Sequence, residues 1–336
     1  MSAGAAIALF VAGLTLSALS SVVLSTTLDR TAARLDFSEG LLGIVTAVGA
    51  DAPEIAAAVT ALLAGRRDVG VGVVLGSNIF NVAVLLGLSA TIAGGVHIHR
   101  RGLWFQGTMG LVATVIAVIL VLGVVSGAVA FGILLVVFVP YLFVSALGPR
   151  RMKTLMAPTR IAEFLCAAMA AQERDSRAPQ RPRRADGHDA LTTVPALFSV
   201  VAGSIAMVRA AQTLGDRWHV PGVIVGTLVL ATLTGVPNVL AAVRLARAGR
   251  GSAVVSETLN SNTANVLIGL CIPAMVGGLG AATGAVRLEA WWLLASTILA
   301  LLLTGFRGRL RRGEGAVILL TYAGFVIAIV ATQSVS

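Results

Sequence analysis

Charged residues are scarce in this 336-residue sequence, in which Asp, Glu, Lys and Arg together make up 12%. Hydrophobic residues account for 57%, and the mean hydropathy is +0.92. A soluble domain of this length does not need so much apolar surface, so the composition excludes an ordinary soluble globular protein. Long apolar runs recur along the whole chain, rather than the short alternating segments of a transmembrane barrel. The sequence therefore predicts a polytopic helical membrane protein.

Cysteine is also scarce, with only Cys166 and Cys271 present, one in a polar stretch and one in an apolar run. This usage predicts no disulfide framework, and the spacing of a cysteine metal site is missing. The N-terminus lacks a positively charged start, because its first charged residue is Asp29. We therefore expect residues 4–26 to be a retained first membrane span and not a cleaved signal peptide.

Apolar runs of membrane-spanning length predict an all-α fold with about ten transmembrane helices. The expected spans are residues 4–26, 39–64, 70–93, 103–123, 126–147, 192–214, 221–246, 253–279, 287–306 and 315–333. A polar segment divides them into two five-helix repeats, residues 1–147 and 192–336, joined by a linker at 148–191. Within the linker, residues 161–172 are expected to form either an interfacial helix or a cytosolic connector helix.

The net charge of +10 is compatible with a nucleic-acid partner, but the bilayer explains it better. If the N-terminus lies outside, the inside loops hold twenty Lys and Arg residues and the outside loops hold four. Because positive residues collect in cytoplasmic loops, this bias predicts both termini outside and the central loop in the cytoplasm. We expect an integral, multi-pass protein of the plasma (inner) membrane, with no nucleic-acid partner.

A sequence motif occurs twice, as GADAPE (49–54) with LGSNIFNV (75–82), and as LTGVPN (233–238) with LNSNTANV (259–266). Equivalent residues lie 184 positions apart without a gap. In the predicted topology the two copies cross the membrane in opposite directions. This is an inverted-topology repeat, a transporter architecture whose substrate site is expected near the bilayer midplane.

Two acids in the second span need an explanation. Pro53 is expected to kink or break the helix and free backbone carbonyls as ligands. Asp51 and Glu54 are three residues apart and share a helix face. Without a partner they would repel each other unless a cation or protons neutralise them. The alternative is a structural ion pair.

Further oxygen-bearing side chains follow in both repeats. The candidate cation-binding residues are Asp51, Glu54, Ser77, Asn78, Asn81, Thr234, Asn238, Ser261, Asn262 and Asn265. Glu257, the third acid placed within a span, is an accessory candidate at the site or at the cytoplasmic mouth. Carboxylates, amides and hydroxyls suit hard cations such as Ca²⁺, Na⁺ or Mg²⁺. The alternative role for the amides and hydroxyls is hydrogen bonding between helices. His97 and His99 are interpreted as surface residues.

These motifs resemble the cation/calcium exchanger superfamily, which includes the sodium/calcium exchangers. A buried PE followed by GSNIFN carries the resemblance, and both halves of the chain take part. The resemblance implies that Glu54 is the central carboxylate ligand. By position it also implies ligand roles for Ser77, Asn81, Thr234, Ser261 and Asn265. With Asp51 added because it shares a helix face with Glu54, the expected metal-binding core is Asp51, Glu54, Asn81 and Asn265.

The sequence departs from the family pattern in the second repeat. Asn238 replaces an acid, Asn265 stands where an acid is often found, and Asp51 replaces a small hydroxyl residue. The acids are thus concentrated in the first repeat. Two neighbouring carboxylates favour proton uptake when the cation leaves, so H⁺ coupling is at least as favoured as Na⁺ coupling.

The resulting hypothesis is a secondary active cation antiporter, exchanging Ca²⁺ for Na⁺ or H⁺ by alternating access, and not an enzyme. No cofactor is expected, and the transported cations and the lipid bilayer are the expected partners. One alternative keeps the fold but carries another ion, as in Na⁺/H⁺ exchange or transport of another divalent metal. Another is a degenerate, non-transporting homologue that acts as a sensor or scaffold. The sequence carries no signal for an oligomeric state.

Overall fold

The computed structural model describes residues 1–34, 39–97, 100–155, 159–176 and 188–334. The first half contains α1 (Ala3–Arg34), α2 (Glu39–Ala50), α3 (Ala52–Leu63), α4 (Arg67–Phe80), the π-helix η1 (Asn81–Leu86), α5 (Gly87–Ile92), β1 (Gly95–His97), α6 (Arg100–Val121), α7 (Gly127–Leu155) and α8 (Arg160–Ser176). The second half contains α9 (His188–Trp218), α10 (Gly222–Ile224), the π-helix η2 (Val225–Leu230), α11 (Ala231–Arg247), α12 (Gly251–Ala264), the π-helix η3 (Asn265–Cys271), α13 (Ile272–Gly277), α14 (Gly284–Arg307), β2 (Arg309–Arg311) and α15 (Arg312–Ser334).

The predicted helical membrane fold is confirmed. Within the described ranges, nine helical stretches are long and apolar enough to cross a membrane. The remaining predicted span, 39–64, is present as the two shorter helices α2 and α3. A helix is also present where the linker was expected to hold one, because α8 covers 161–172. Residues 177–187 of the predicted linker lie outside the described residues.

The second span breaks at Asp51, as the neighbouring proline predicts. Asp51 has φ −85° and ψ 1° and separates α2 from α3, which has Pro53 in its first turn. Pro53 cannot donate the helical hydrogen bond to the carbonyl of Gly49. The second repeat differs, because Pro237 lies inside the continuous helix α11. Its irregularity comes earlier, in the π-helix η2. The duplication therefore preserves the prolines but not the backbone around them.

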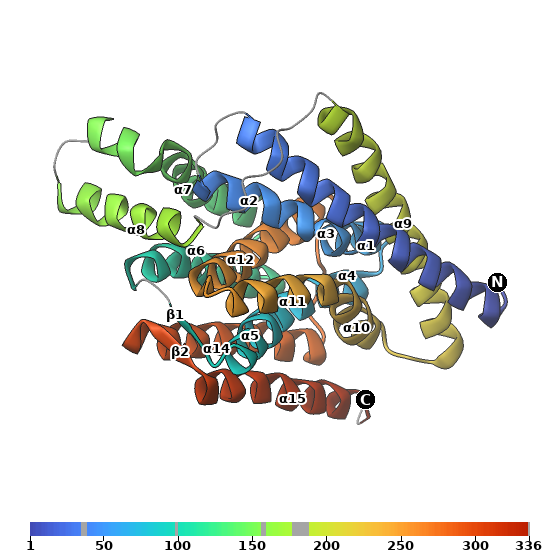
Figure 1. Ribbon diagram of the computed structural model, residues 1–336. Coiled ribbons are helices and arrows are strands. Elements are labelled where there is room, and N and C mark those ends of the chain that lie inside the picture. The colour runs from blue at the N-terminus through green and yellow to red at the C-terminus, as the bar shows by residue number, and fades with distance from the viewer. Residues whose placement is uncertain (35–38, 98–99, 156–158, 177–187, 335–336) are drawn as a thin grey trace.

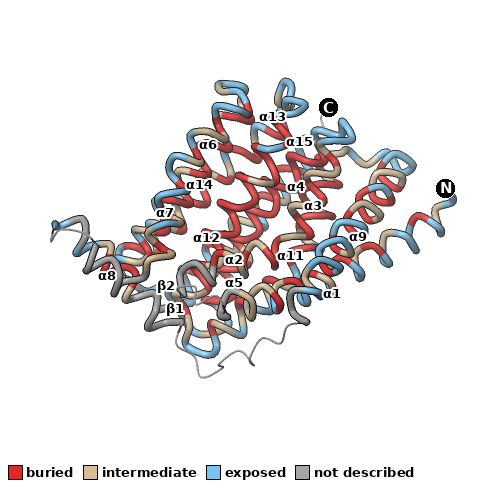
Figure 2. Tube along the Cα trace, turned by 90° about the horizontal axis from the view of Figure 1, so that it is seen from above, coloured by how far each residue is buried: buried red, intermediate tan, exposed pale blue. Residues whose placement is uncertain are grey.

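Two spans form the centre of the bundle. In the span Arg67–Ile92, which contains α4, 94% of the most apolar window is buried, against 22% in the span of α1. Figure 2 shows the same contrast, with α4 and α12 buried and α1 largely exposed. Both central spans are crowded with small and polar residues. They therefore place the GSNIFN-type motifs inside the protein, away from lipid.

The helices α1 and α9 lie side by side along one flank of the bundle (Figure 1). A Cβ added to Gly13 would lie 2.7 Å from the carbonyl oxygen of Gly203, and one added to Gly203 would lie 2.7 Å from that of Gly13. The hydroxyls of Ser17 and Ser204 are 2.9 Å apart. Small residues thus allow the two backbones to approach closely, as in other membrane helix pairs.

The two ends of the bundle differ. Strands β1 and β2 pair antiparallel, with Val96 opposite Leu310. This two-stranded sheet, which the sequence did not predict, lies with α8 at one end, and both chain termini lie at the other (Figures 1 and 2). An arrangement of ten spans requires both termini on the same side of the membrane, and this geometry agrees with it.

Candidate cation-binding site

The two central spans change from α to π geometry at equivalent residues. In the first repeat α4 ends at Phe80 and η1 begins at Asn81. In the second repeat α12 ends at Ala264 and η3 begins at Asn265. The two asparagines are 184 positions apart. Because π-helical segments occur frequently at functional sites, this shared irregularity marks the region where the sequence predicts ligands.

Four asparagines join the two central helices across the repeats. The side-chain amide of Asn78 donates to the backbone carbonyl of Asn262 at 3.1 Å, and that of Asn262 donates to Asn78 at the same distance. Asn81 Nδ2 donates to Asn262 Oδ1, and Asn265 Nδ2 donates to Asn78 Oδ1, both at 3.1 Å. All four side chains are buried. We call these residues the asparagine quartet; its bonds fix how α4 and α12 cross.

The carboxylates of the first repeat reach the second repeat. Asp51 is 0% exposed and Glu54 is 2% exposed, because the break in the second span directs this turn into the protein. Asn238 Nδ2 donates to Asp51 Oδ1 at 2.8 Å. The Ser261 side chain also interacts electrostatically with the Asp51 carboxyl group. The structure therefore brings residues of both motif copies together around one acid.

Several buried oxygen atoms of this region have no hydrogen-bond partner within the described part of the chain. They are Asp51 Oδ2, Glu54 Oε2, Ser77 Oγ and Asn265 Oδ1. Asp51 and Glu54 interact electrostatically, and Asn265 is bonded to Asn78, the neighbour of Ser77. Buried polar atoms are nearly always paired, so each of these needs an explanation. Carboxylate, hydroxyl and amide oxygens are the donor set of a hard cation.

Neither site carboxylate has an ion-pair partner among the described residues. An ion pair elsewhere among the described residues, Arg66 with Asp216, lies at the surface, and both of its side chains are exposed. Arg209, the basic residue that the sequence places within a span, is exposed. An isolated buried carboxylate is costly. The structural ion pair considered from the sequence therefore has no support in the described part of the chain.

Two further candidates lie beside this cluster. Glu257 is partly buried, its Oε2 atom has no partner, and its carboxyl interacts electrostatically with that of Asp51. The Thr234 hydroxyl donates to the carbonyl of Leu230 at 2.8 Å, which leaves its oxygen able to accept or coordinate. Thr234 lies one turn before Asn238 on α11 and so shares its helix face.

A further acid within a span was not among the predicted residues. Glu289 lies inside the predicted ninth span and is 0% exposed on α14. The signal was present in the sequence, as a carboxylate within the apolar run 287–306. A second polar contact was also missed, in which Tyr141 Oη donates to Asn260 Oδ1 at 2.8 Å. Asn260 immediately precedes Ser261, so this bond links α7 to the part of α12 that carries the candidate residues.

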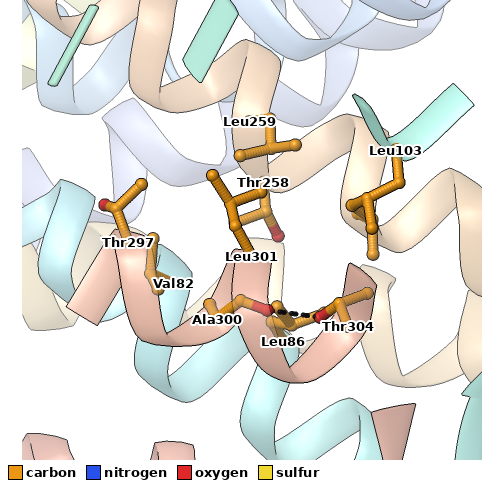
Figure 3. A pocket seen from close by; sticks show the side chains of 10 residues that line it. Val82, Leu86, Leu103, Thr258, Leu259, Thr297, Ala300, Leu301 and Thr304 are labelled. Atoms are coloured by element: carbon orange, nitrogen blue, oxygen red, sulfur yellow. Dashed lines mark hydrogen bonds between the residues drawn. The ribbon is translucent and has the colours of Figure 1, made fainter. Parts of the chain in front are cut away.

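A small hollow between η1, α6, α12 and α14 contains none of the candidate residues (Figure 3). Its lining is mostly apolar, and Leu86, Leu103 and Leu259 contribute to it. The Thr304 hydroxyl donates to the carbonyl of Ala300 at 2.6 Å, as the dashed line in Figure 3 shows. Thr297 Oγ1, which also lines the hollow, has no hydrogen-bond partner among the described residues. No carboxylate or amide side chain of the described ranges lines the hollow, so a single unpartnered hydroxyl does not make the oxygen ligand set of a hard cation.

Comparison with protein families agrees with the motif pattern. The family model described as sodium/calcium exchanger protein matches residues 5–156 and 188–331, which is most of the chain. The putative antiporter CaxA of Alkalimonas amylolytica is 23% identical over 303 residues, covering 88% of this chain and 89% of CaxA. The inner membrane protein YrbG of Escherichia coli is 27% identical over 295 residues, covering 84% and 82%.

Similarity to animal exchangers is confined to part of the chain. The sodium/potassium/calcium exchanger Nckx30C of Drosophila melanogaster is 29% identical over 143 residues, covering 40% of this chain and 16% of Nckx30C. The chain thus matches far less than two thirds of that relative's length. Among solved structures, the sodium-calcium exchanger NCX_Mj superposes with a TM-score of 0.63 at 20% identity, covering 98% of this chain and 99% of that one. This likeness concerns the fold.

Proposed function

The chain belongs to the sodium/calcium exchanger family, and from this premise we propose that it is a secondary active antiporter exchanging Ca²⁺ for Na⁺ or H⁺. One observation carries the proposal. Asp51, Glu54, Ser77 and Asn265 each carry a buried oxygen atom that has no hydrogen-bond partner among the described residues, and the two carboxylates among them have no cationic partner there. A transported cation would supply the missing partner for these atoms.

The proposed ligands divide into charged and neutral groups. Asp51 and Glu54 supply the negative charge, and Ser77, Ser261 and Asn265 supply neutral oxygens. The other members of the predicted set are proposed to supply further neutral oxygens and to hold the two repeats in position at the site. They are Asn78, Asn81, Thr234, Asn238 and Asn262. Two carboxylates balance the charge of one divalent cation, so the loss of an acid at position 238 is compatible with Ca²⁺ binding.

The coupling ion is proposed from the same carboxylates. When Ca²⁺ leaves, Asp51 and Glu54 are two neighbouring buried acids, and Glu257 adds a third carboxyl near Asp51. Like charges this close are neutralised by cations or by protons. Two Na⁺ ions or two protons both satisfy this requirement. H⁺ is therefore as acceptable as Na⁺ on charge alone, and transport measurements must separate them.

We propose the division of the chain into two transport repeats, residues 1–147 and 192–336, with 148–191 as the linker. The proposed orientation has both termini outside and the linker in the cytoplasm, supported by the bias of Lys and Arg along the sequence. In this orientation the end with α8 and the β1–β2 sheet faces the cytoplasm (Figure 1). The proposed location is the plasma (inner) membrane.

The direct test is transport by the purified full chain in liposomes that contain a Ca²⁺-sensitive dye. An outward Na⁺ gradient, an outward H⁺ gradient and no gradient are compared at equal external Ca²⁺. We expect at least one gradient to accelerate Ca²⁺ entry at least tenfold, and Glu54→Gln to remove the acceleration. Glu163→Gln, an exposed acid on α8, is the matched control. If neither gradient moves Ca²⁺ although the protein is folded, Ca²⁺ antiport is excluded.

A further inference from the structure

Glu289 is a fully buried acid outside the candidate cation site. It lies in the second turn of α14, a helix that packs against α4, α6, α15, η1 and β2. Its side chain is 0% exposed. The Thr227 hydroxyl on η2 donates to Glu289 Oε1, and Glu289 Oε2 has no hydrogen-bond partner. An acid held this way is costly, so it is expected to serve a function.

The inverted repeat shows that packing alone does not require an acid here. The residue equivalent to Glu289, 184 positions earlier, is Phe105. Phe105 packs against Tyr141 with ring centroids 5.0 Å apart. The equivalent of Thr227 is Gly43, which has no hydroxyl. The second repeat has therefore replaced an aromatic core residue by a carboxyl group together with its hydroxyl partner.

The surroundings of Glu289 favour a neutral carboxyl group. Glu289 has no ion-pair partner among the described residues, and a hydroxyl alone does not compensate a buried carboxylate charge. A protonated carboxyl group needs no countercharge. Among the groups of its surroundings, Asp68 interacts electrostatically with Glu289, and as another acid it adds no positive charge.

The other charged and titratable groups on the packed elements are accounted for as follows. Arg67 on α4 donates to the carbonyl of Gly277 at 3.1 Å. Arg287 on α14 itself is exposed. The Tyr322 hydroxyl on α15 is 2.9 Å from the Thr232 hydroxyl. The remaining groups are near the far end of α14, about 27 Å away along the helix axis at 1.5 Å per residue; they are Arg100, Arg101, Arg309, Arg311, Arg312 and Glu314.

Packing contacts connect Glu289 to the helix that carries the site, and an electrostatic interaction connects it to an acid at the surface. Asp68 is exposed in the first turn of α4. On the inner side, a Cβ added to Gly72 would lie 2.8 Å from Thr227 Oγ1, and one added to Gly76 would lie 2.8 Å from Thr227 Cα. Gly76 is followed by Ser77, so Thr227 packs between Glu289 and the part of α4 that enters the candidate site.

We propose that Glu289 is a proton-binding site separate from the cation site, occupied by H⁺ in this conformation and exchanging protons with the end of the bundle where Asp68 lies. Its use in transport rests on the proposed antiport function. Proton loss places an uncompensated charge against η2 and α4, which favours a conformation in which water reaches the carboxylate. A change in the contact between Thr227 and α4 then links this site to the cation site.

Infrared spectroscopy of the purified full chain tests the proton without requiring transport. At low pH the wild type is expected to show a protonated-carboxyl C=O band that Glu289→Gln lacks and that the control Glu163→Gln retains. Glu289→Asp should restore the band at a shifted frequency. Thr227→Val keeps the acid but removes its donor, and should shift the band even if Glu289→Gln does not fold. Bands in Glu289→Gln or Thr227→Val that match the wild type would overturn the proposal.

Transport in liposomes then tests the use of the proton. Cation flux of the wild type is measured against external pH and compared with Glu289→Gln. The cation flux of the wild type is expected to change at least fivefold across one step of its pH profile. The variant is expected to lack this step while still binding the cation. An unchanged pH profile would overturn the role in coupling. If the wild type moves no cation at all, the antiport function fails, and the infrared result still decides whether Glu289 holds a proton.

Discussion

Asn78 and Asn262 each donate their side-chain amide to the other's backbone carbonyl, at 3.1 Å in both directions. They lie 184 positions apart, on the central helices α4 and α12. The pair thus makes a two-fold symmetric contact between equivalent residues of the two repeats. Asn81 and Asn265 extend it with a second symmetric pair of bonds. This symmetry predicts equal and coupled effects when the contact is broken.

Asn78→Ala and Asn262→Ala should destabilise the protein by similar amounts. Each removes one bond to a partner carbonyl and also the acceptor of another quartet amide, Asn265 or Asn81. A buried group left unpaired costs about 1–3 kcal/mol. The double variant should depart from the sum of the two, because both residues belong to one hydrogen-bonded network between α4 and α12. Thermal unfolding in detergent gives the measurement.

A matched comparison uses Asn260→Ala, which removes a buried asparagine bonded to Tyr141 instead of the quartet. Its effect should add to that of Asn78→Ala within about 0.5 kcal/mol, because the two share no partner. Full additivity of Asn78→Ala with Asn262→Ala would contradict the quartet as a coupled unit.

Glu54→Gln should leave folding intact and remove cation binding. The substitution keeps the shape of a 2%-exposed side chain whose Oε2 atom has no partner. Without cation, the variant should be at least as stable as the wild type, because an unpaired carboxylate has been removed. A ligand at one hundred times its Kd stabilises the native state by about 2.7 kcal/mol, so the wild type should show a clear Ca²⁺-dependent rise in Tm. Glu54→Gln should show no Ca²⁺-dependent rise in Tm. If its rise equals that of the Glu163→Gln control, the cation site lies elsewhere.

Asn238→Asp tests the contact between the repeats at the site. Asn238 Nδ2 donates to Asp51 Oδ1 at 2.8 Å, so the substitution sets two carboxylates against each other. The repulsion exists when both are ionised and disappears when one binds a proton. Without cation, the variant should therefore lose stability as pH rises, and Ca²⁺ should restore it. The measurement is Tm against pH, with chelator and with Ca²⁺.

The exchanged double variant, Asp51→Asn with Asn238→Asp, is the control for that experiment. It keeps one carboxyl and one amide across the same contact. Its stability should depend on pH as the wild type's does. If the single and double variants show the same dependence of Tm on pH, repulsion between the carboxylates at positions 51 and 238 is not the cause of the stability loss at high pH. A change of ion preference in the exchanged variant would further indicate which repeat must hold the charge.

Much of this architecture could be predicted because it depends on local patterns. The apolar runs define the spans, and a proline within a span predicts the break that lies at Asp51. The duplication identifies Asn78 and Asn262 as equivalent. It does not reveal that they contact each other, since an inverted repeat specifies correspondence and not which residues meet at the symmetry axis. The π segments and the pairing of β1 with β2 depend on contacts far apart in sequence and left no local signal.

The absence of a counterpart to Asp51 in the second repeat has a steric explanation that the sequence alone could not supply. The residue equivalent to Asp51 is Gly235, 184 positions later. A Cβ on Gly235 would lie 2.8 Å from two ring carbons of Phe80. The residue equivalent to Phe80 is Ala264. The repeats thus differ in side-chain volume at equivalent positions. Phe80 packs against Gly235, whereas the equivalent positions hold Ala264 and Asp51.

Gly235→Ala should therefore destabilise the protein by about 1–3 kcal/mol, the usual cost of overpacking a filled core. Phe80→Ala alone should cost about 3–5 kcal/mol, because it leaves a cavity. In the double variant the added methyl group no longer meets the ring, so the destabilisation caused by Gly235→Ala should largely disappear. A double-mutant cycle of thermal stability measures this coupling. Gly132→Ala on α7, where an added Cβ meets nothing within 4 Å, should change Tm little and serves as the control. If Gly235→Ala is tolerated as well as Gly132→Ala, sterics do not explain why the second repeat has no counterpart of Asp51.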